Sequence, residues 1–257
     1  MINFDAEINS IKNDYVRGSS EIALHSLDIL ASAAKRMPLE NQKENLIRLS
    51  ISLTEAKPAM AALKNIIKKC VDAIDIFIEQ KDFINALQNI KIDYLNSLNE
   101  CLVLAFDKLF KDKKQLTVAT CSYSGTMANL FKKASDNNIE LKLFTLESKW
   151  GGYDYSSKLI FEMQFYGIEG VIWNFENNDD IINEIDFGII GADKILKNNG
   201  IINGSPSLTL AKKLEKSKPL YVVAESVKND DKIMTTDGYD FIPNNLITEI
   251  ISDNYVI

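Results

Sequence analysis

Residues able to bind an anion or to move a proton gather in short segments of the second half of the chain. Cys121-Ser122-Tyr123-Ser124-Gly125 places hydroxyl groups before a helical stretch, where backbone N–H groups and the helix dipole favour an anion. Further along lie Glu147 to Asp154, which includes a lysine and aromatic residues, then Gly191 to Lys194 and Asn203-Gly204-Ser205. Hydroxyls, amides, one lysine and one carboxylate suit a small phosphorylated or polyhydroxy ligand. The glycine pattern is neither a dinucleotide-binding fingerprint nor a P-loop.

The composition disfavours several other kinds of chemistry. The 257 residues contain three cysteines and one histidine, so a zinc site, a histidine-based catalytic triad and a secreted disulfide framework are not expected. A net charge of −7, with the acidic excess in the second half, argues against direct binding of nucleic acid. No apolar run approaches the roughly 18 residues of a membrane span. We therefore expect a cytoplasmic protein without a metal or an organic cofactor.

The sequence of the first half of the chain predicts helices. Apolar residues recur at steps of three and four, which is typical of amphipathic helices that pack on one another. Pro38 and Pro58 separate the helical stretches, and Gly18 is the only glycine before residue 115. These features predict a helical domain over residues 1–114. The predicted apolar faces contain Ile22, Leu27, Leu30 and Ala34, then Leu46, Leu49 and Leu53, then Val71, Ile74 and Ile78.

The second half alternates between short β-branched runs and helical stretches. This alternation predicts a Rossmann-like α/β domain over residues 115–257, with a parallel sheet covered by helices. Ligands bind at the carboxyl ends of the strands in such sheets, so the polar segments should converge at one edge. Ser205 and Pro206 are expected to cap the last of the helices. The predicted strands are 116–121, 141–146, 170–175, 187–192 and 220–224, and the predicted helices are 126–135, 155–166, 179–184 and 207–216.

Several motifs resemble the translation initiation factor 2B α/β/δ family, which also contains methylthioribose-1-phosphate and ribose-1,5-bisphosphate isomerases. In the helical half, Val16-Arg17-Gly18-Ser19 resembles its R-G-A/S segment, and Glu55-Ala56-Lys57-Pro58 resembles its T-R-P segment. The similar segments of the second half are Val118 to Ser124, Leu146 to Lys149, Ile190 to Leu196 with Asn199-Gly200 and Asn203 to Ser205, Pro219 to Ala224, and Tyr239 to Thr248.

The resemblance implies a fold, a ligand and partners. It implies a helical domain before a Rossmann-like domain, self-association through the latter as a homodimer or larger assembly, and a pocket between the halves for a sugar phosphate or nucleotide. Translation initiation factor 2 is a further expected partner. Trp150 and Tyr153 either line this pocket or pack as a lid on the core. The expected ligand-binding residues are Arg17, Gly18, Ser19, Lys57, Ser124, Gly125, Lys149, Asn203, Gly204 and Ser205.

Whether this chain is an enzyme depends on the predicted proton-transfer pair. The resemblance implies a cysteine and an aspartate in the isomerases; here Asp193 matches the aspartate, whereas Ser122 stands at the position of the thiol. A serine hydroxyl is a poor acid or base near neutral pH, and Cys121 would need a local change of register to replace it.

Other departures from the isomerase pattern also argue against catalysis. Lys57 and Lys149 stand where arginine is usual, and Gly204 stands where the isomerases have lysine. We therefore favour a noncatalytic, factor-like protein that binds a small phosphorylated ligand. The alternative is an aldose-ketose isomerase acting on ribose 1,5-bisphosphate or a related phosphorylated pentose, with Asp193, Ser122 and Cys121 as its catalytic residues.

Overall fold

The computed structural model describes residues 3–77, 79–174, 180–233 and 235–253. Packing divides the chain into two units, Met1–Asn96 and Ser97–Ile257. This division falls within helix α5 (Gln80–Leu109), whereas the secondary structure changes from helix to strand between Leu109 and Gln115. The boundary predicted at residues 114 and 115 follows the change in secondary structure, and the two units divide earlier in the chain.

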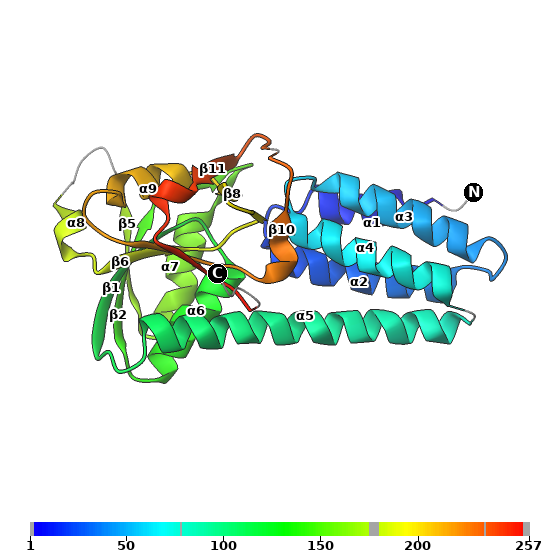
Figure 1. Cartoon of the computed structure of the whole chain (residues 1–257), viewed down its shortest axis with the longest axis horizontal. Coiled ribbons are helices and arrows are strands. Elements are labelled where there is room, and N and C mark those ends of the chain that lie inside the picture. The colour runs from blue at the N-terminus through cyan, green and yellow to red at the C-terminus, as the bar shows by residue number, and fades with distance from the viewer. Residues whose placement is uncertain (1–2, 78, 175–179, 234, 254–257) are drawn as a thin grey trace. The chain divides into compact units, whose positions relative to one another are not determined.

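The first unit is helical, as predicted, and its helices lie alongside one another (Figure 1). The predicted faces of α2 and α3 are buried, because every one of their seven apolar residues is at most 1% exposed. On the third predicted face Ile74 is buried, Val71 is half-buried, and Ile78 lies outside the described residues. The buried stripe of α4 contains Leu63, Ile66, Ile67 and Cys70 in addition to Ile74. The helices are α1 (Asp5–Lys12), α2 (Ser19–Arg36), α3 (Gln42–Ala56), α4 (Ala61–Ile76) and the first part of α5.

The second unit contains a parallel sheet of six strands, which confirms the predicted fold class. Its spatial order is β5-β2-β1-β6-β9-β12, so the strands follow the order 3-2-1-4-5-6 of the Rossmann fold. The sixth strand, β12, escaped the sequence prediction because it is only three residues long. Residues 175 and 179, at the ends of two predicted elements, lie outside the described residues. The strands are β1 (Gln115–Cys121), β2 (Glu140–Leu146), β5 (Glu169–Trp173), β6 (Phe187–Ile190), β9 (Leu220–Val223) and β12 (Glu249–Ile251).

The two faces of this sheet are covered by different elements (Figure 1). The C-terminal part of α5, with α6 (Gly125–Asp136) and α7 (Tyr155–Gln164), packs on the face that carries Leu116 and Val118. Helix α9 (Ser207–Leu214) packs on the opposite face, which carries Ala119 and Cys121. Alternate residues of β1 therefore enter different cores, as the two-residue period of a strand requires.

A second sheet and a hairpin, which the sequence did not predict, adjoin the main sheet. The second sheet has the order β10-β7-β8-β11, and the hairpin pairs β3 with β4. These strands are β3 (Lys149–Trp150), β4 (Tyr153–Asp154), β7 (Lys194–Leu196), β8 (Gly200–Gly204), β10 (Asn229–Asp230) and β11 (Tyr239–Pro243). The remaining short elements are α8 (Ile181–Glu184) and the 3₁₀ turns η1 (Ser226–Lys228) and η2 (Asn244–Leu246).

No helix within the described ranges combines the length and the apolar character that crossing a membrane demands.

Candidate functional site

The strand order places a crevice at the carboxyl ends of β1 and β6. From β1 the chain continues to β2 and β5 on one side, and it later returns to form β6, β9 and β12 on the other. The loops after β1 and β6 therefore leave the sheet in opposite directions, which is where Rossmann-like sheets bind ligands. The two loops touch, since a Cβ atom added to Gly191 would lie 3.1 Å from Ser124 Oγ. The structure thus brings two of the predicted polar segments together.

The loop after β1 ends in a capped helix. Ser124 is the N-cap of α6, and its Oγ accepts a hydrogen bond from the backbone N–H of Met127 at 3.4 Å. Ser122 has a φ of +60°, in the left-handed region. Helix α6 has 12 residues, so the partial positive charge at its N-terminus faces this loop. This is the loop in which the sequence predicts binding of an anion at Ser124 and Gly125, and the helix dipole would favour one there.

Cys121 and Ser122 occupy different environments. Cys121 is 4% exposed, and its Sγ lies 3.1 Å from Ser207 Oγ. Ser207 Oγ donates to the carbonyl oxygen of Gly204 at 2.6 Å, so its single proton is used and the thiol must donate to it. Burial raises the pKa of Cys121 to about 12. Ser122 Oγ instead faces Gly204, 3.8 Å from where a Cβ atom of that residue would lie.

The predicted ligand-binding side chains of the third segment make internal hydrogen bonds. Asn203 Nδ2 donates to Ser207 Oγ at 2.7 Å, and Ser205 Oγ donates to Asp240 Oδ1 at 2.6 Å. The other oxygen of Asp240 accepts from the backbone N–H of Leu208 at 2.9 Å. Asp240 therefore caps α9, while Ser205 does not: the prediction of Ser205 as N-cap was wrong, and Pro206 holds that position. Sequence reasoning missed Asp240 because it lies more than 30 residues away from its partners.

Asp193 follows β6 by three residues and is half-buried. Its backbone N–H donates to the carbonyl oxygen of Ile202 at 2.9 Å, which ties this segment to β8. The adjacent Lys194 is buried and pairs with Asp230 at 3.3 Å. The lysine of this segment is therefore held in a buried ion pair with Asp230.

Two lysines lie near the candidate site, and the sequence singled out only one of them. Lys149 is 59% exposed, with Nζ 2.5 Å from Glu147 Oε1 and 3.9 Å from Asp154 Oδ2. Lys158, on α7, is half-buried, and its Nζ lies 3.4 Å from the centroid of the Tyr123 ring. Tyr123 directly precedes the N-cap of α6, so Lys158 places a cation beside that loop. No motif in the sequence marks Lys158, because its position depends on the packing of α7 beside α6.

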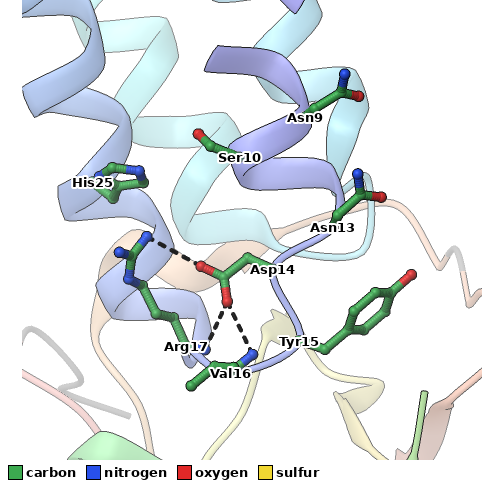
Figure 2. Close-up of a pocket in the computed structure, with 8 residues that line it drawn as sticks. All are labelled: Asn9, Ser10, Asn13, Asp14, Tyr15, Val16, Arg17 and His25. Carbon is green, nitrogen blue, oxygen red and sulfur yellow. Dashed lines mark hydrogen bonds and ion pairs between the residues drawn. The ribbon is translucent and has the colours of Figure 1, made fainter. Parts of the chain in front are cut away.

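The predicted residues of the helical unit come together around Asp14. The Asp14 carboxylate accepts hydrogen bonds from the backbone N–H groups of Val16 and Arg17, each at 2.9 Å, and from Arg17 Nη1 at 3.1 Å (Figure 2). Lys57 Nζ donates to the carbonyl oxygen of Asp14 at 2.9 Å. Arg17 and Lys57, which are 40 residues apart, therefore meet at one turn.

The helical unit carries an open hollow of about 440 Å³ at this turn (Figure 2). Its lining includes Arg17 and His25. Burial lowers the pKa of His25, and the charge of Arg17 lowers it further. Gly18 and Ser19 begin α2, where the Gly18 N–H donates to Glu21 Oε2 at 3.0 Å and Ser19 is buried. Within the described residues, no group of three His, Cys, Asp or Glu side chains is arranged to hold a metal ion.

A sequence model of the initiation factor 2 subunit family (IF-2B) matches residues 15–244. The chain belongs to this family. This IF-2B family member is 23% identical over 226 residues to a translation initiation factor eIF-2B subunit 2-like protein of Pyrococcus horikoshii, covering 86% of this chain and 77% of that relative. It is 26% identical over 230 residues to the ribose 1,5-bisphosphate isomerase of Archaeoglobus fulgidus, covering 87% and 71%.

Solved structures of the IF-2B family share the fold of this chain. The crystal structure of the Pyrococcus horikoshii translation initiation factor eIF-2B matches with a TM-score of 0.85 at 18% identity, covering 98% of this chain and 96% of that one. A chain of the tetrameric eIF2B-beta2-delta2 complex of C. thermophilum matches with a TM-score of 0.76 at 15% identity, covering 98% and 90%. Since the relatives include both a factor-like protein and an isomerase, the residues of the site must distinguish the two functions.

Proposed function

We propose that this protein is an initiation factor 2B subunit-like member of the family that binds a small phosphorylated ligand, a nucleotide or a sugar phosphate, without converting it. The ligand site is the crevice between the loops after β1 and β6. The phosphate faces the N-terminus of α6, where Ser124 and Gly125 begin the helix and the Ser122 hydroxyl lies nearby. The half-buried Lys158 supplies positive charge on the same side.

The observation that carries the noncatalytic assignment is the state of the Cys121 thiol. An aldose-ketose isomerase needs groups that exchange protons near neutral pH. The Cys121 thiol is buried, donates to Ser207 and has a pKa of about 12. The resemblance places Ser122 where the isomerases have their thiol. A serine hydroxyl does not titrate near neutral pH. Gly204 leaves the space facing Ser122 without the lysine that the resemblance implies for an isomerase.

The alternative is a ribose 1,5-bisphosphate isomerase or a close relative. Two observations favour it: the 26% identity to a protein of that name, and the position of Asp193 after β6 at the carboxyl edge of the sheet. In that case Asp193 would transfer the proton, and replacing it with asparagine would abolish turnover.

The two functions separate in a test of the full chain with phosphorylated aldoses, including ribose 1,5-bisphosphate. We expect calorimetry to detect binding of at least one phosphorylated compound and NMR to detect no ketose. Conversion to a ketose that the Asp193→Asn variant abolishes would contradict the noncatalytic assignment and establish the isomerase. Failure of every phosphorylated compound to bind would contradict the ligand-binding assignment.

A pair of variants at Ser122 tests the position of the phosphate. Asp and Asn both tolerate a left-handed φ and have similar size, so they differ mainly in charge. We expect Ser122→Asp to weaken binding of a phosphorylated ligand at least about tenfold, because a carboxylate would repel the anion, and Ser122→Asn to change it less than about threefold. Equal effects of the two substitutions would place the phosphate elsewhere.

We also propose that the protein self-associates through residues 115–257 and acts with translation initiation factor 2 in the cytoplasm. The support is membership of the IF-2B family and the similarity to a chain from a tetrameric eIF2B complex. Light scattering on the full chain would show a particle of at least twice 28.9 kDa, and a monomer at micromolar concentration would contradict self-association.

A further inference from the structure

A buried carboxylate contacts the first turn of α6. Glu225 follows β9 by two residues and is 0% exposed. Alternate residues of a strand share a face, and Val223 belongs to the core that α6 covers, so Glu225 points toward the same helix. Its Oε1 accepts a hydrogen bond from Thr126 Oγ1 at 3.5 Å. Thr126 is the second residue of α6, so Glu225 contacts the helix at the end where the proposed ligand binds.

The carboxylate of Glu225 forms a buried ion pair. Lys228 Nζ lies 2.7 Å from Glu225 Oε2, and the two side chains are 4% and 0% exposed. The backbone N–H of Lys228 also donates to the carbonyl oxygen of Glu225 at 2.9 Å. Between them, Ser226 donates its backbone N–H and its hydroxyl to the Asp253 carboxylate at 2.6 and 3.0 Å. These bonds fix the turn that carries both charges, so the pair has a defined position beside α6.

The contact with Thr126 limits the distance between Glu225 and a bound anion. An anion at a helix N-terminus accepts from the first backbone N–H groups at about 3 Å, and the N–H of Thr126 is one of these groups. Adding the span of the Thr126 side chain and the 3.5 Å contact puts such an anion at most about 10 Å from the carboxylate. At that separation, with an effective dielectric constant of about 20, one unit charge changes the affinity for a singly charged anion roughly tenfold.

We propose that the Glu225–Lys228 pair sets the affinity of the anion site at the N-terminus of α6. Glu225 repels a bound anion, and Lys228, which pairs with the other carboxylate oxygen, offsets most of that repulsion. Both charges are buried, so water and salt screen them less than they screen exposed charges. The inference rests on the proposed function and adds two residues that act on that site through their charge, without contact with the ligand.

Two single substitutions that remove opposite charges test the pair. Binding of ribose 5-phosphate is measured by calorimetry at pH 8. Glu225→Gln leaves the Lys228 cation without its counter-charge and should tighten binding at least about fivefold. Lys228→Met keeps the apolar stem of the side chain, leaves the Glu225 carboxylate without its counter-charge and should weaken binding at least about threefold. A purely structural role of the pair would weaken binding in both variants.

Two further variants control for folding and for net charge. The double variant Glu225→Gln/Lys228→Met has no buried charge left unpaired, and neutral residues of similar volume often replace a buried ion pair without loss of stability. It should therefore fold even if a single variant does not, and it should bind ribose 5-phosphate within about twofold of the unmodified chain. Glu184→Gln removes the same formal charge from an exposed ion pair with Lys142 and should leave the affinity unchanged.

The outcomes separate this inference from the proposed function. Unchanged or weaker binding in Glu225→Gln, unchanged or tighter binding in Lys228→Met, or a loss of more than about twofold in the folded double variant would overturn the electrostatic role alone. Tightening in Glu184→Gln equal to that in Glu225→Gln would also overturn it, because the effect would then come from net charge. If the unmodified chain binds neither ribose 5-phosphate nor any other phosphorylated compound, the proposed function fails together with the inference.

Discussion

At the scale of single residues, the site depends on which way neighbouring side chains point. Cys121 ends β1 with its thiol directed to Ser207, whereas Ser122 leaves the strand with a φ of +60° and faces Gly204. The sequence indicated that the two neighbours would point in opposite directions. Only the structure shows that the thiol is the buried one, and its raised pKa follows from that burial.

A residue-scale prediction compares the two lysines near α6. Lys158 is half-buried beside Tyr123, whereas Lys149 is exposed and lies near two carboxylates. Charges at the exposed position are screened by water and salt more strongly than partly buried ones. We therefore expect Lys158→Gln to weaken binding of a phosphorylated ligand roughly fivefold and Lys149→Gln less than about twofold, as measured by calorimetry at about 0.1 M salt. A larger loss for Lys149→Gln would show that the hairpin lysine holds the phosphate instead.

At the scale of elements, β8 positions Gly204 and Ser205 through its pairing with β11. Gly200 begins β8 opposite Pro243 with a φ of +135°, and an added Cβ atom would lie 2.0 Å from the carbonyl oxygen of Ile242. This contact is with backbone, so a side chain cannot be accommodated without separating the strands. The pairing of β8 with β11 therefore depends on glycine at residue 200.

A prediction at this scale compares alanine substitutions of the glycines at the two ends of β8. We expect Gly200→Ala to lower the free energy of unfolding by more than about 2 kcal/mol, because of the clash and the strained φ. Gly204→Ala, where the nearest atom is Ser122 Oγ at 3.8 Å, should change it by less than about 0.5 kcal/mol. Urea denaturation followed by circular dichroism measures both. Unchanged stability in Gly200→Ala would mean that β8 and β11 do not pair in this register.

At the scale of the whole molecule, several pKa shifts act together on stability. Burial raises the pKa of Asp253, but hydrogen bonds from Ser97, Ser226 and Ser252 outweigh it and bring the pKa below its usual value. Burial lowers the pKa of His25. Burial also raises the pKa of Cys70 and of Cys121, each to about 12.

The signs of these shifts predict a stability maximum near neutral pH. Below about 6.5 the unfolded chain binds a proton at His25 more readily than the folded chain, and below about 4 the same holds for Asp253, so stability falls with acid. Above about 9 the unfolded thiols ionise first, so stability falls with alkali. Urea midpoints measured from about pH 4 to 10 should show a plateau between about 7 and 8.5. His25→Gln should remove part of the decrease between about pH 6.5 and 5, and a decrease of the same size in that variant would contradict the assignment.

Much of the fold was predictable because it depends on local periodicity. Apolar residues at steps of three and four predicted the buried faces of α2 and α3, and β-branched runs predicted five strands of the main sheet. The short strands of the second sheet and the β3–β4 hairpin escaped prediction, because two or three residues carry no measurable period. The third predicted face was confirmed only at Ile74, since Val71 is half-buried and Ile78 lies outside the described residues.

By itself, then, the sequence determined the two kinds of secondary structure, their order along the chain and the polar segments after the strands, because these follow from residue types at short spacing. The tertiary structure alone decided the strand order that places β1 beside β6, the burial of the Cys121 thiol and the contact of Thr126 with Glu225. The physical reason is that a pattern of apolar residues states which face of an element is buried. It does not state which distant element covers that face, and the chemistry of this site depends on those distant partners.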